Sequence, residues 1–180
     1  MGVVQITGGA LRSRKITFTE AKGLRPTLSK TREAIFNILA SYIDFSTASF
    51  LDLYGGSGIM ALEAKSRGFE SVFCNEANPL VAKNIKNNIR ELSVKITLSN
   101  QKAESFITSS QQAFDVIYID PPYYDNLYDK ILKLIIDKNS LKKGGFIIIE
   151  KNAKTDVNFD NFTIFKEKTY SNKDIVFLTL

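Results

Sequence analysis

The sequence predicts an α/β fold: a mostly parallel, doubly wound sheet of seven strands with an antiparallel edge strand, preceded by a small β-hairpin. Short apolar segments alternate with helical ones from residue 49 onward, which is typical of a parallel sheet covered by helices on both faces. Only a polar turn separates the last two apolar segments. Strands joined so closely pair antiparallel, so we expect the antiparallel pairing at one edge.

The N-terminal part of the chain follows a different pattern. Residues 2–7 and 14–19 flank a pair of glycines and predict the two strands of the hairpin. Residues 28–42 carry apolar side chains at helical spacing, so we expect a helix there. This pattern divides the chain into a basic hairpin extension, residues 1–24, and a main domain, residues 25–180.

The alternating segments of the main domain locate its strands and helices. Asn78-Pro79 is the clearest helix start, because Asn caps a helix well and Pro suits the first helical position. We expect strands at residues 49–54, 71–75, 95–98, 114–119, 146–149, 162–166 and 175–180. We expect helices at residues 59–67, 103–109 and 129–136, and from Pro79 onward.

The composition excludes several kinds of chemistry. Cys74 is the single cysteine and there is no histidine, which rules out an internal disulfide, cysteine-cluster and His-ligated metal sites, and Ser-His-Asp hydrolysis. We therefore expect no metal. No apolar run approaches the roughly 18 residues that a membrane span needs, and no signal-peptide pattern opens the chain. A soluble, cytoplasmic protein with no membrane partner is expected, with a monomer as the default state.

The net charge of +5 is unevenly distributed. Residues 1–32 contain seven Lys or Arg side chains against Glu20, and four of the six arginines lie there, whereas the rest of the chain is nearly neutral. The planar guanidinium group suits phosphate oxygens. The N-terminal segment therefore predicts a docking surface for a polyanion, although a solvated basic terminus is the competing interpretation.

A glycine-rich turn follows the first strand of the main domain. Residues 52–58 read Asp-Leu-Tyr-Gly-Gly-Ser-Gly, and Gly56 stands twenty residues before Glu76, at the end of the next strand. Such turns let the backbone approach a ligand closely, and an acidic residue at that distance can accept hydrogen bonds from ribose hydroxyls. The pattern predicts an adenosine-type cofactor. Asp52 would repel a pyrophosphate but suits a cationic amino group, which favours S-adenosylmethionine over NAD or FAD.

A second motif, Asp120-Pro121-Pro122-Tyr123, follows the most apolar strand. The prolines fix the backbone and remove two donors, so the Asp120 carboxylate and the Pro121 carbonyl form a rigid pair of acceptors. An exocyclic amine of a nucleobase offers two N–H donors to such a pair, and Tyr123 can stack on the base. The acceptors would stabilise the positive charge that develops on the amine nitrogen as it takes a methyl group.

These motifs, with Gly8-Gly9, the Arg-Ser-Arg-Lys run from Arg12 and the segments 23–27 and 31–39, resemble the ribosomal small-subunit methyltransferase D family of class I, Rossmann-like methyltransferases. The resemblance covers nearly the whole chain. It implies S-adenosylmethionine as cofactor and methylation of the N2 amine of a guanine in 16S rRNA, with guanine 966 as the family's target, in free RNA or in the assembled small subunit.

The resemblance also implies roles for individual residues. Asp120, Pro121, Pro122 and Tyr123 would hold the target guanine. Cofactor contacts would come from Arg25, Thr27, Asp52, Tyr54, Gly55, Gly56, Ser57, Gly58, Glu76, Ala77, Lys102, Ala103 and Asp120. RNA phosphates would contact Arg12, Arg14, Lys15 and Arg32. Two positions depart from the family pattern: Lys102 replaces the usual Asp or Asn, so the Ala103 backbone would meet the adenine, and Gly55 replaces the usual alanine.

Three alternatives fit parts of the pattern. An N6-adenine DNA methyltransferase shares the Asp-Pro-Pro-Tyr motif, but 180 residues leave no room for a target-recognition region. An NAD(P)-dependent dehydrogenase would use the glycine turn and leave the proline motif without a role. An RNA-binding module with a vestigial cofactor fold would not need Glu76, Asp120 and Tyr123 together.

Overall fold

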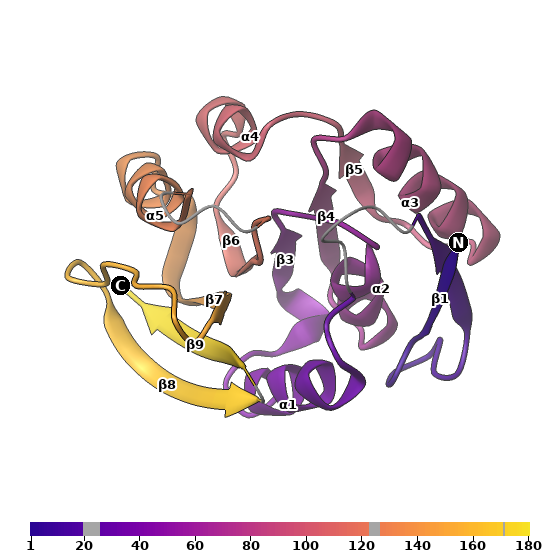
Figure 1. Cartoon of the computed structure of the whole chain (residues 1–180), viewed down its shortest axis with the longest axis horizontal. Coiled ribbons are helices and arrows are strands. Elements are labelled where there is room, and N and C mark those ends of the chain that lie inside the picture. The colour runs from indigo at the N-terminus through magenta and orange to yellow at the C-terminus, as the bar shows by residue number, and fades with distance from the viewer. Residues whose placement is uncertain (20–25, 123–126, 171) are drawn as a thin grey trace.

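A seven-stranded sheet runs through the molecule in the order β5-β4-β3-β6-β7-β9-β8, which confirms the predicted fold class (Figure 1). The structure is a computed structural model and describes residues 1–19, 26–122, 127–170 and 172–180. The sheet strands are β3 (Ser49–Asp52), β4 (Ser71–Asn75), β5 (Thr97–Ser99), β6 (Phe114–Ile119), β7 (Leu141–Asn152), β8 (Thr163–Tyr170) and β9 (Lys173–Thr179). The helices are α1 (Ser29–Leu39), α2 (Ile59–Ser66), α3 (Pro79–Glu91), α4 (Ala103–Ser109) and α5 (Leu127–Asp137), with a 3₁₀ turn at Phe45–Thr47.

Five neighbouring strands, β5 through β7, are parallel, and β9 is antiparallel to both of its neighbours. The predicted antiparallel pairing therefore lies at this edge, but the reversed strand is β9, which is inserted between β7 and β8. Strand β7 begins at Leu141, five residues before the predicted strand, because Leu141 already pairs with Phe114 across an irregularity in the register. No helix in the described part of the chain is long and apolar enough to cross a membrane.

Alternate side chains of the central strands enter two separate cores. Phe50, Val116 and Ile148 face one cluster with apolar residues of α1, α2 and α3. Their neighbours Leu51 and Ile117 face the other cluster with residues of α4 and α5. Figure 1 shows these two helix groups on opposite sides of the sheet. Burial of both faces explains why the central strands are continuous apolar runs.

The strand order reverses between β3 and β6. From β3 the chain moves outward to β4 and β5, and from β6 it moves the other way to β7. In open α/β sheets the crevice beyond the carboxyl ends of the strands at such a switch point is the usual ligand site. The expected ligand site therefore lies at the carboxyl ends of β3, β4 and β6.

The N-terminal hairpin, β1 (Gly2–Gln5) with β2 (Lys15–Phe18), packs against the body of the protein next to α3 (Figure 1). Ile6 and Ile16 belong to the core beneath α1, α2 and α3. The Asn88 side chain of α3 donates to the Thr17 carbonyl at 2.7 Å. The hairpin is thus fixed to the main domain. The predicted boundary between residues 24 and 25 lies outside the described residues and stays a prediction.

The loop of the hairpin is held by the end of α2. The Ser66 hydroxyl donates to the Gly8 carbonyl and accepts from the Leu11 amide, and the Ser66 carbonyl accepts from the Ala10 amide at 2.7 Å. Gly9 has a φ of +77°, and a Cβ there would lie 1.9 Å from the Ser66 carbonyl oxygen. Only glycine permits that approach. The basic residues of the loop are therefore held at one place on the surface.

Candidate active site

Three carboxylates gather at the carboxyl ends of β3, β4 and β6. Asp52 is the last residue of β3, while Glu76 and Asp120 directly follow β4 and β6. Strand β3 pairs in parallel with both of the others, so the three side chains meet at one edge of the sheet. The charges of Glu76 and Asp120 both act to raise the pKa of Asp52, which places the three groups within electrostatic reach of one another.

The glycine turn between β3 and α2 is closed by its own backbone and by Glu76. Gly58 has a φ of +76°, its amide donates to the Gly55 carbonyl at 2.6 Å, and it caps α2. Glu76 accepts from the Gly56 amide at 2.9 Å and from the Asn78 amide at 2.7 Å. Glu76 therefore has a fixed position beside the turn and remains half-buried. This fits its expected contact with ribose hydroxyls, which stays a prediction.

Asp52 is buried without a full set of hydrogen-bond partners. Its side chain is 1% exposed, and Oδ2 accepts one long bond from the Ala61 amide at 3.3 Å. No group in the described part of the chain donates to Oδ1 within hydrogen-bond geometry. Burial, and then the neighbouring carboxylates, raise the pKa of Asp52 to about 7. A buried acceptor of this kind fits the cationic amino group of S-adenosylmethionine.

The Asp52→Asn variant is expected to flatten the pH dependence of stability of the cofactor-free protein. Because the pKa is higher in the folded state, this carboxyl stabilises the fold most below about pH 4, and that contribution is lost as pH rises through about 7. Tm measured between pH 5 and 8 should therefore fall less in Asp52→Asn than in wild type. Cofactor affinity should drop by about tenfold or more, because a charge-assisted hydrogen bond is lost. The exposed Asp160→Asn should match wild type in both measurements; parallel curves for wild type and Asp52→Asn would contradict the assignment.

Tyr54 and Ser57 lie in the glycine turn, Ala77 follows β4, and Lys102 and Ala103 follow β5. Ser57 is 5% exposed, and the Tyr54 hydroxyl is buried with no partner among the described residues. Ala77 is exposed, Lys102 is exposed just before α4, and Ala103 is the first residue of α4. Arg25 lies outside the described residues.

The sequence analysis did not single out two asparagines that hold the adjoining loops. Asn75 Nδ2 donates to the carbonyls of Leu53 at 3.2 Å and Gln101 at 3.0 Å. Asn100 Nδ2 donates to the carbonyls of Glu76 and Ala77. These two side chains link the loops that follow β3, β4 and β5. Their position at the ends of β4 and β5 was the one feature of the sequence that could have identified them.

Asp120 lies beside a second acidic residue and a lysine. Lys173 Nζ is 3.4 Å from Asp120 Oδ1 and 3.3 Å from Glu150 Oε1. Burial, followed by the charge of Glu150, raises the pKa of Asp120, and Lys173 opposes that effect. Pro121 is buried and Pro122 is exposed, whereas Tyr123 lies outside the described residues. The assignment of these four residues to the target base stays a prediction.

Thr27 connects the segment before α1 to this cluster. Its side chain is buried, and its hydroxyl lies 3.0 Å from the hydroxyl of Tyr118, a residue of β6. Thr27 is thereby held near the carboxyl end of β6, which fits its expected cofactor contact, and that contact stays a prediction.

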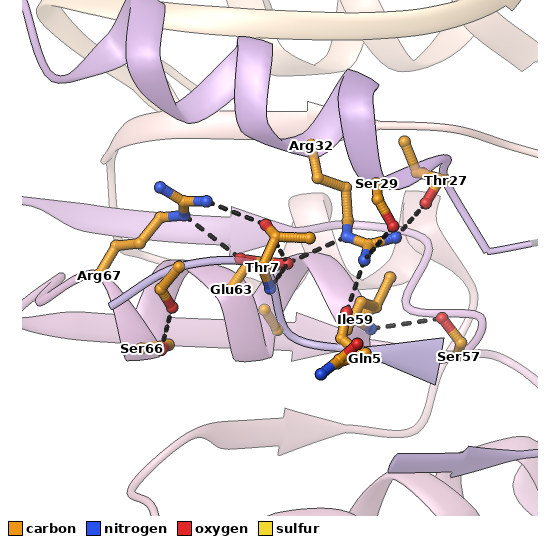
Figure 2. Close-up of polar contacts among 12 residues, drawn as sticks. Gln5, Thr7, Thr27, Ser29, Arg32, Ser57, Ile59, Glu63, Ser66 and Arg67 are labelled. Carbon is orange, nitrogen blue, oxygen red and sulfur yellow. Dashed lines mark hydrogen bonds and ion pairs between the residues drawn. The ribbon is translucent and has the colours of Figure 1, made fainter. Parts of the chain in front are cut away.

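The predicted RNA-contacting residues divide into two groups. Arg12, Arg14 and Lys15 are exposed on the hairpin and stay candidates for phosphate contacts. The prediction for Arg32 is wrong, because its side chain is only 1% exposed. Figure 2 shows the Arg32 guanidinium enclosed between α1, the hairpin and Glu63 of α2.

Arg32 is satisfied by internal partners. Its Nε donates to Glu63 Oε1 at 3.0 Å, and its two terminal nitrogens donate to the carbonyls of Thr27 and of Gln5, the latter at 2.7 Å (Figure 2). The helix pattern contained a signal for this burial. Arg32 precedes Ile35, Phe36 and Leu39 by three, four and seven residues, so it lies on the buried face of α1.

The chain as a whole is similar to one group of known proteins. The profile of the family described as conserved hypothetical protein 95 matches residues 4–179. A Haemophilus influenzae protein named ribosomal RNA small subunit methyltransferase D is 35% identical over 174 residues, which cover 93% of this chain and 89% of that protein. The chain belongs to the ribosomal RNA small subunit methyltransferase D family.

Two further similarities cover different lengths of the family fold. The solved structure of the putative methyltransferase yhhF from Escherichia coli superposes with a TM-score of 0.89 at 25% identity, covering 98% of this chain and 97% of that one. A tRNA (guanine(26)-N(2))-dimethyltransferase from Methanothermobacter thermautotrophicus is 40% identical over 75 residues, which are 41% of this chain and 20% of that protein. Membership in the methyltransferase D family confirms the predicted enzyme class, a methyltransferase that uses S-adenosylmethionine.

Proposed function

We propose that the protein transfers a methyl group from S-adenosylmethionine to the N2 amine of a guanine in 16S rRNA of the small ribosomal subunit, with guanine 966 as the expected base. The observation that carries this proposal is the position of Asp120. It begins the Asp-Pro-Pro segment at the end of β6, within electrostatic reach of Asp52 beside the glycine turn. The name of the family relative supports ribosomal RNA of the small subunit as the substrate. The name of the guanine-N2 dimethyltransferase supports a guanine N2 amine as the acceptor.

The chain's own residues would bind and orient both reactants. Asp52 would receive the amino group of the cofactor and Glu76 its ribose, while the cofactor supplies an electrophilic methyl group. The Asp120 carboxylate and the Pro121 carbonyl would accept hydrogen bonds from the two N–H groups of the guanine amine. These bonds direct the nitrogen lone pair away from the ring and stabilise the positive charge that develops on nitrogen. The base must be flipped out or unpaired to reach them.

The hairpin would supply the RNA-binding surface. Arg12, Arg14 and Lys15 are exposed on a loop and strand that Ser66 and Asn88 fix to the body of the protein. Fixed cations of this kind attract the phosphate backbone without reading sequence. The predicted contact therefore explains affinity for RNA, while the choice of guanine must come from the fit of the base and its surroundings.

The Arg12→Ala/Arg14→Ala variant is expected to bind RNA more weakly and with a flatter salt dependence. Loss of two phosphate contacts should reduce the slope of log K against log salt by about 1 to 2. Fluorescence anisotropy with a 16S rRNA fragment at several salt concentrations measures that slope. Lys133→Ala/Lys138→Ala removes the same charge from an exposed position of α5 and from the residue directly after it, on the other side of the sheet, and should keep the wild-type slope. A wild-type slope for the arginine variant as well would mean that Arg12 and Arg14 do not contact RNA phosphates.

Methyl transfer to defined nucleic acids tests the proposed substrate. Label from tritiated S-adenosylmethionine should appear in 30S particles or in 16S rRNA lacking the modification, and nucleoside mass spectrometry should identify N2-methylguanine there. Ribosomal RNA from cells without the gene should lack that nucleoside at one position. Label found only in plasmid DNA, as N6-methyladenine, would replace the proposal with the DNA methyltransferase alternative.

A further inference from the structure

Three side chains from three neighbouring strands surround the Asp120 carboxylate. Tyr118 comes from β6, Glu150 from β7 and Lys173 from β9. The antiparallel strand β9 brings Lys173, 53 residues away in the chain, to within 3.4 Å of Asp120. Neither Glu150 nor Lys173 belongs to the glycine turn or to the Asp-Pro-Pro motif, so the proposed reaction so far leaves both without a role.

A chain of contacts leads from Tyr118 through Glu150 to the lysine. Tyr118 is 2% exposed, and its hydroxyl donates to Glu150 Oε2 at 2.6 Å. Burial, and then the charge of Glu150, raises the pKa of the Tyr118 hydroxyl, which therefore remains a neutral donor. The other oxygen of Glu150, Oε1, lies 3.3 Å from Lys173. Glu150 thus holds the ammonium group from one side while Asp120 holds it from the other.

We propose that Lys173 and Glu150 are positioning residues for Asp120: Lys173 keeps the Asp120 carboxylate ionised and fixed, and Glu150 anchors Lys173 while opposing the ionisation of Asp120. This rests on the proposed function, in which Asp120 accepts a hydrogen bond from the amine of the target base. An ionised carboxylate accepts that bond and stabilises positive charge on nitrogen better than a protonated one.

The charges facing Asp120 explain why it needs a cation. From β3 it faces Asp52, from β6 Tyr118, from β7 Glu150 and from β9 Lys173. Among the described residues that face it, two are carboxylates, Tyr118 is a neutral hydroxyl, and Lys173 alone is cationic. Burial and Glu150 raise the pKa of Asp120 to about 7, and Lys173 prevents a larger rise. Loss of the lysine and loss of the second carboxylate should therefore act on Asp120 with opposite signs.

Titration of Asp120 by NMR tests this in the cofactor-free protein. The ¹³Cγ resonance, assigned by its absence in Asp120→Asn, is followed against pH in wild type, Lys173→Met and Glu150→Gln. We expect the midpoint to move up by about one pH unit or more in Lys173→Met and down by a similar amount in Glu150→Gln, because a charge within about 4–6 Å shifts a carboxyl by that order. Lys173→Arg should restore the wild-type midpoint. Lys168→Met, at an exposed position of the neighbouring strand β8, should leave it unchanged.

The rate of single-turnover methyl transfer gives a second readout. The acid limb of its pH–rate profile should have the same midpoint as the NMR titration in each variant. That midpoint should be higher in Lys173→Met and lower in Glu150→Gln. If the midpoints of Lys173→Met and Glu150→Gln equalled that of wild type, or moved in the same direction, Lys173 and Glu150 would be only structural. Either result would overturn the proposal. If Lys173→Met fails to fold, Lys173→Gln and Glu150→Gln decide the same question. The NMR result does not require RNA, so a wrong substrate assignment would remove the activity readout and leave the titration test intact.

Discussion

The Asp120→Ala variant is expected to lose methyl transfer to RNA by at least about 10²- to 10³-fold while largely retaining affinity for S-adenosylmethionine. The variant removes the charged acceptor for the target amine, and losing one preorganised partner of the developing charge has effects of that size. Cofactor binding should survive because Asp52 and Glu76, the groups nearest the glycine turn, remain in place. Loss of the Asp120 charge also removes one influence that raises the pKa of Asp52, so Asp52 is ionised over a wider pH range.

Two measurements separate the roles. Single-turnover transfer from labelled cofactor reports the chemical step, and calorimetry with S-adenosylmethionine reports binding. Asp137→Ala changes an exposed aspartate on α5 and should behave as wild type in both. Asp120→Asn keeps the size of the side chain, and its activity should also fall, because the charge rather than the shape is lost. If Asp120→Ala instead weakened cofactor binding and spared transfer at saturating cofactor, Asp120 would belong to the cofactor site alone.

The Arg32→Met variant is expected to lower the free energy of unfolding by about 3–5 kcal/mol, because it breaks a buried ion pair from one side. Glu63 is 0% exposed and, among the described residues, would keep only Arg67, 3.3 Å away, as its charged partner (Figure 2). The Gln5 and Thr27 carbonyls would also lose their arginine donor. The hairpin and the segment before α1 would both loosen, since Arg32 joins them. For a protein of this size Tm should fall by about 10 °C.

Chemical denaturation and calorimetry measure that loss. Arg90→Met, at an exposed position of α3, should change stability by less than about 0.5 kcal/mol. The Arg32→Met/Glu63→Gln double variant should be less destabilised than the sum of the two single variants, because the charge left unpaired by one change is removed by the other. A loss below about 1 kcal/mol in Arg32→Met would mean that Arg67 alone compensates Glu63.

The sequence by itself determined the architecture and the position of the candidate site. Apolar runs and helical periodicity are local properties, and they located the strands, the glycine turn before Ile59 and the motif after Ile119. The sequence analysis assigned Asp52, Glu76 and Asp120 to the cofactor, and parallel strands that end at one edge of the sheet bring the three together there. The family resemblance rested on the same local motifs.

Tertiary structure alone decided which partners the internal charged side chains meet. Arg32 is close in sequence to the exposed arginines of the hairpin, but it faces Glu63, 31 residues away, and is buried. Lys173 and Glu150 stand in ordinary strand sequences and meet Asp120 only because β9 is inserted between β7 and β8. Strand and helix formation depends on neighbours in the chain, so the sequence alone located those elements. Burial and pairing of charges depend on contacts between distant segments, so only the tertiary structure could show them.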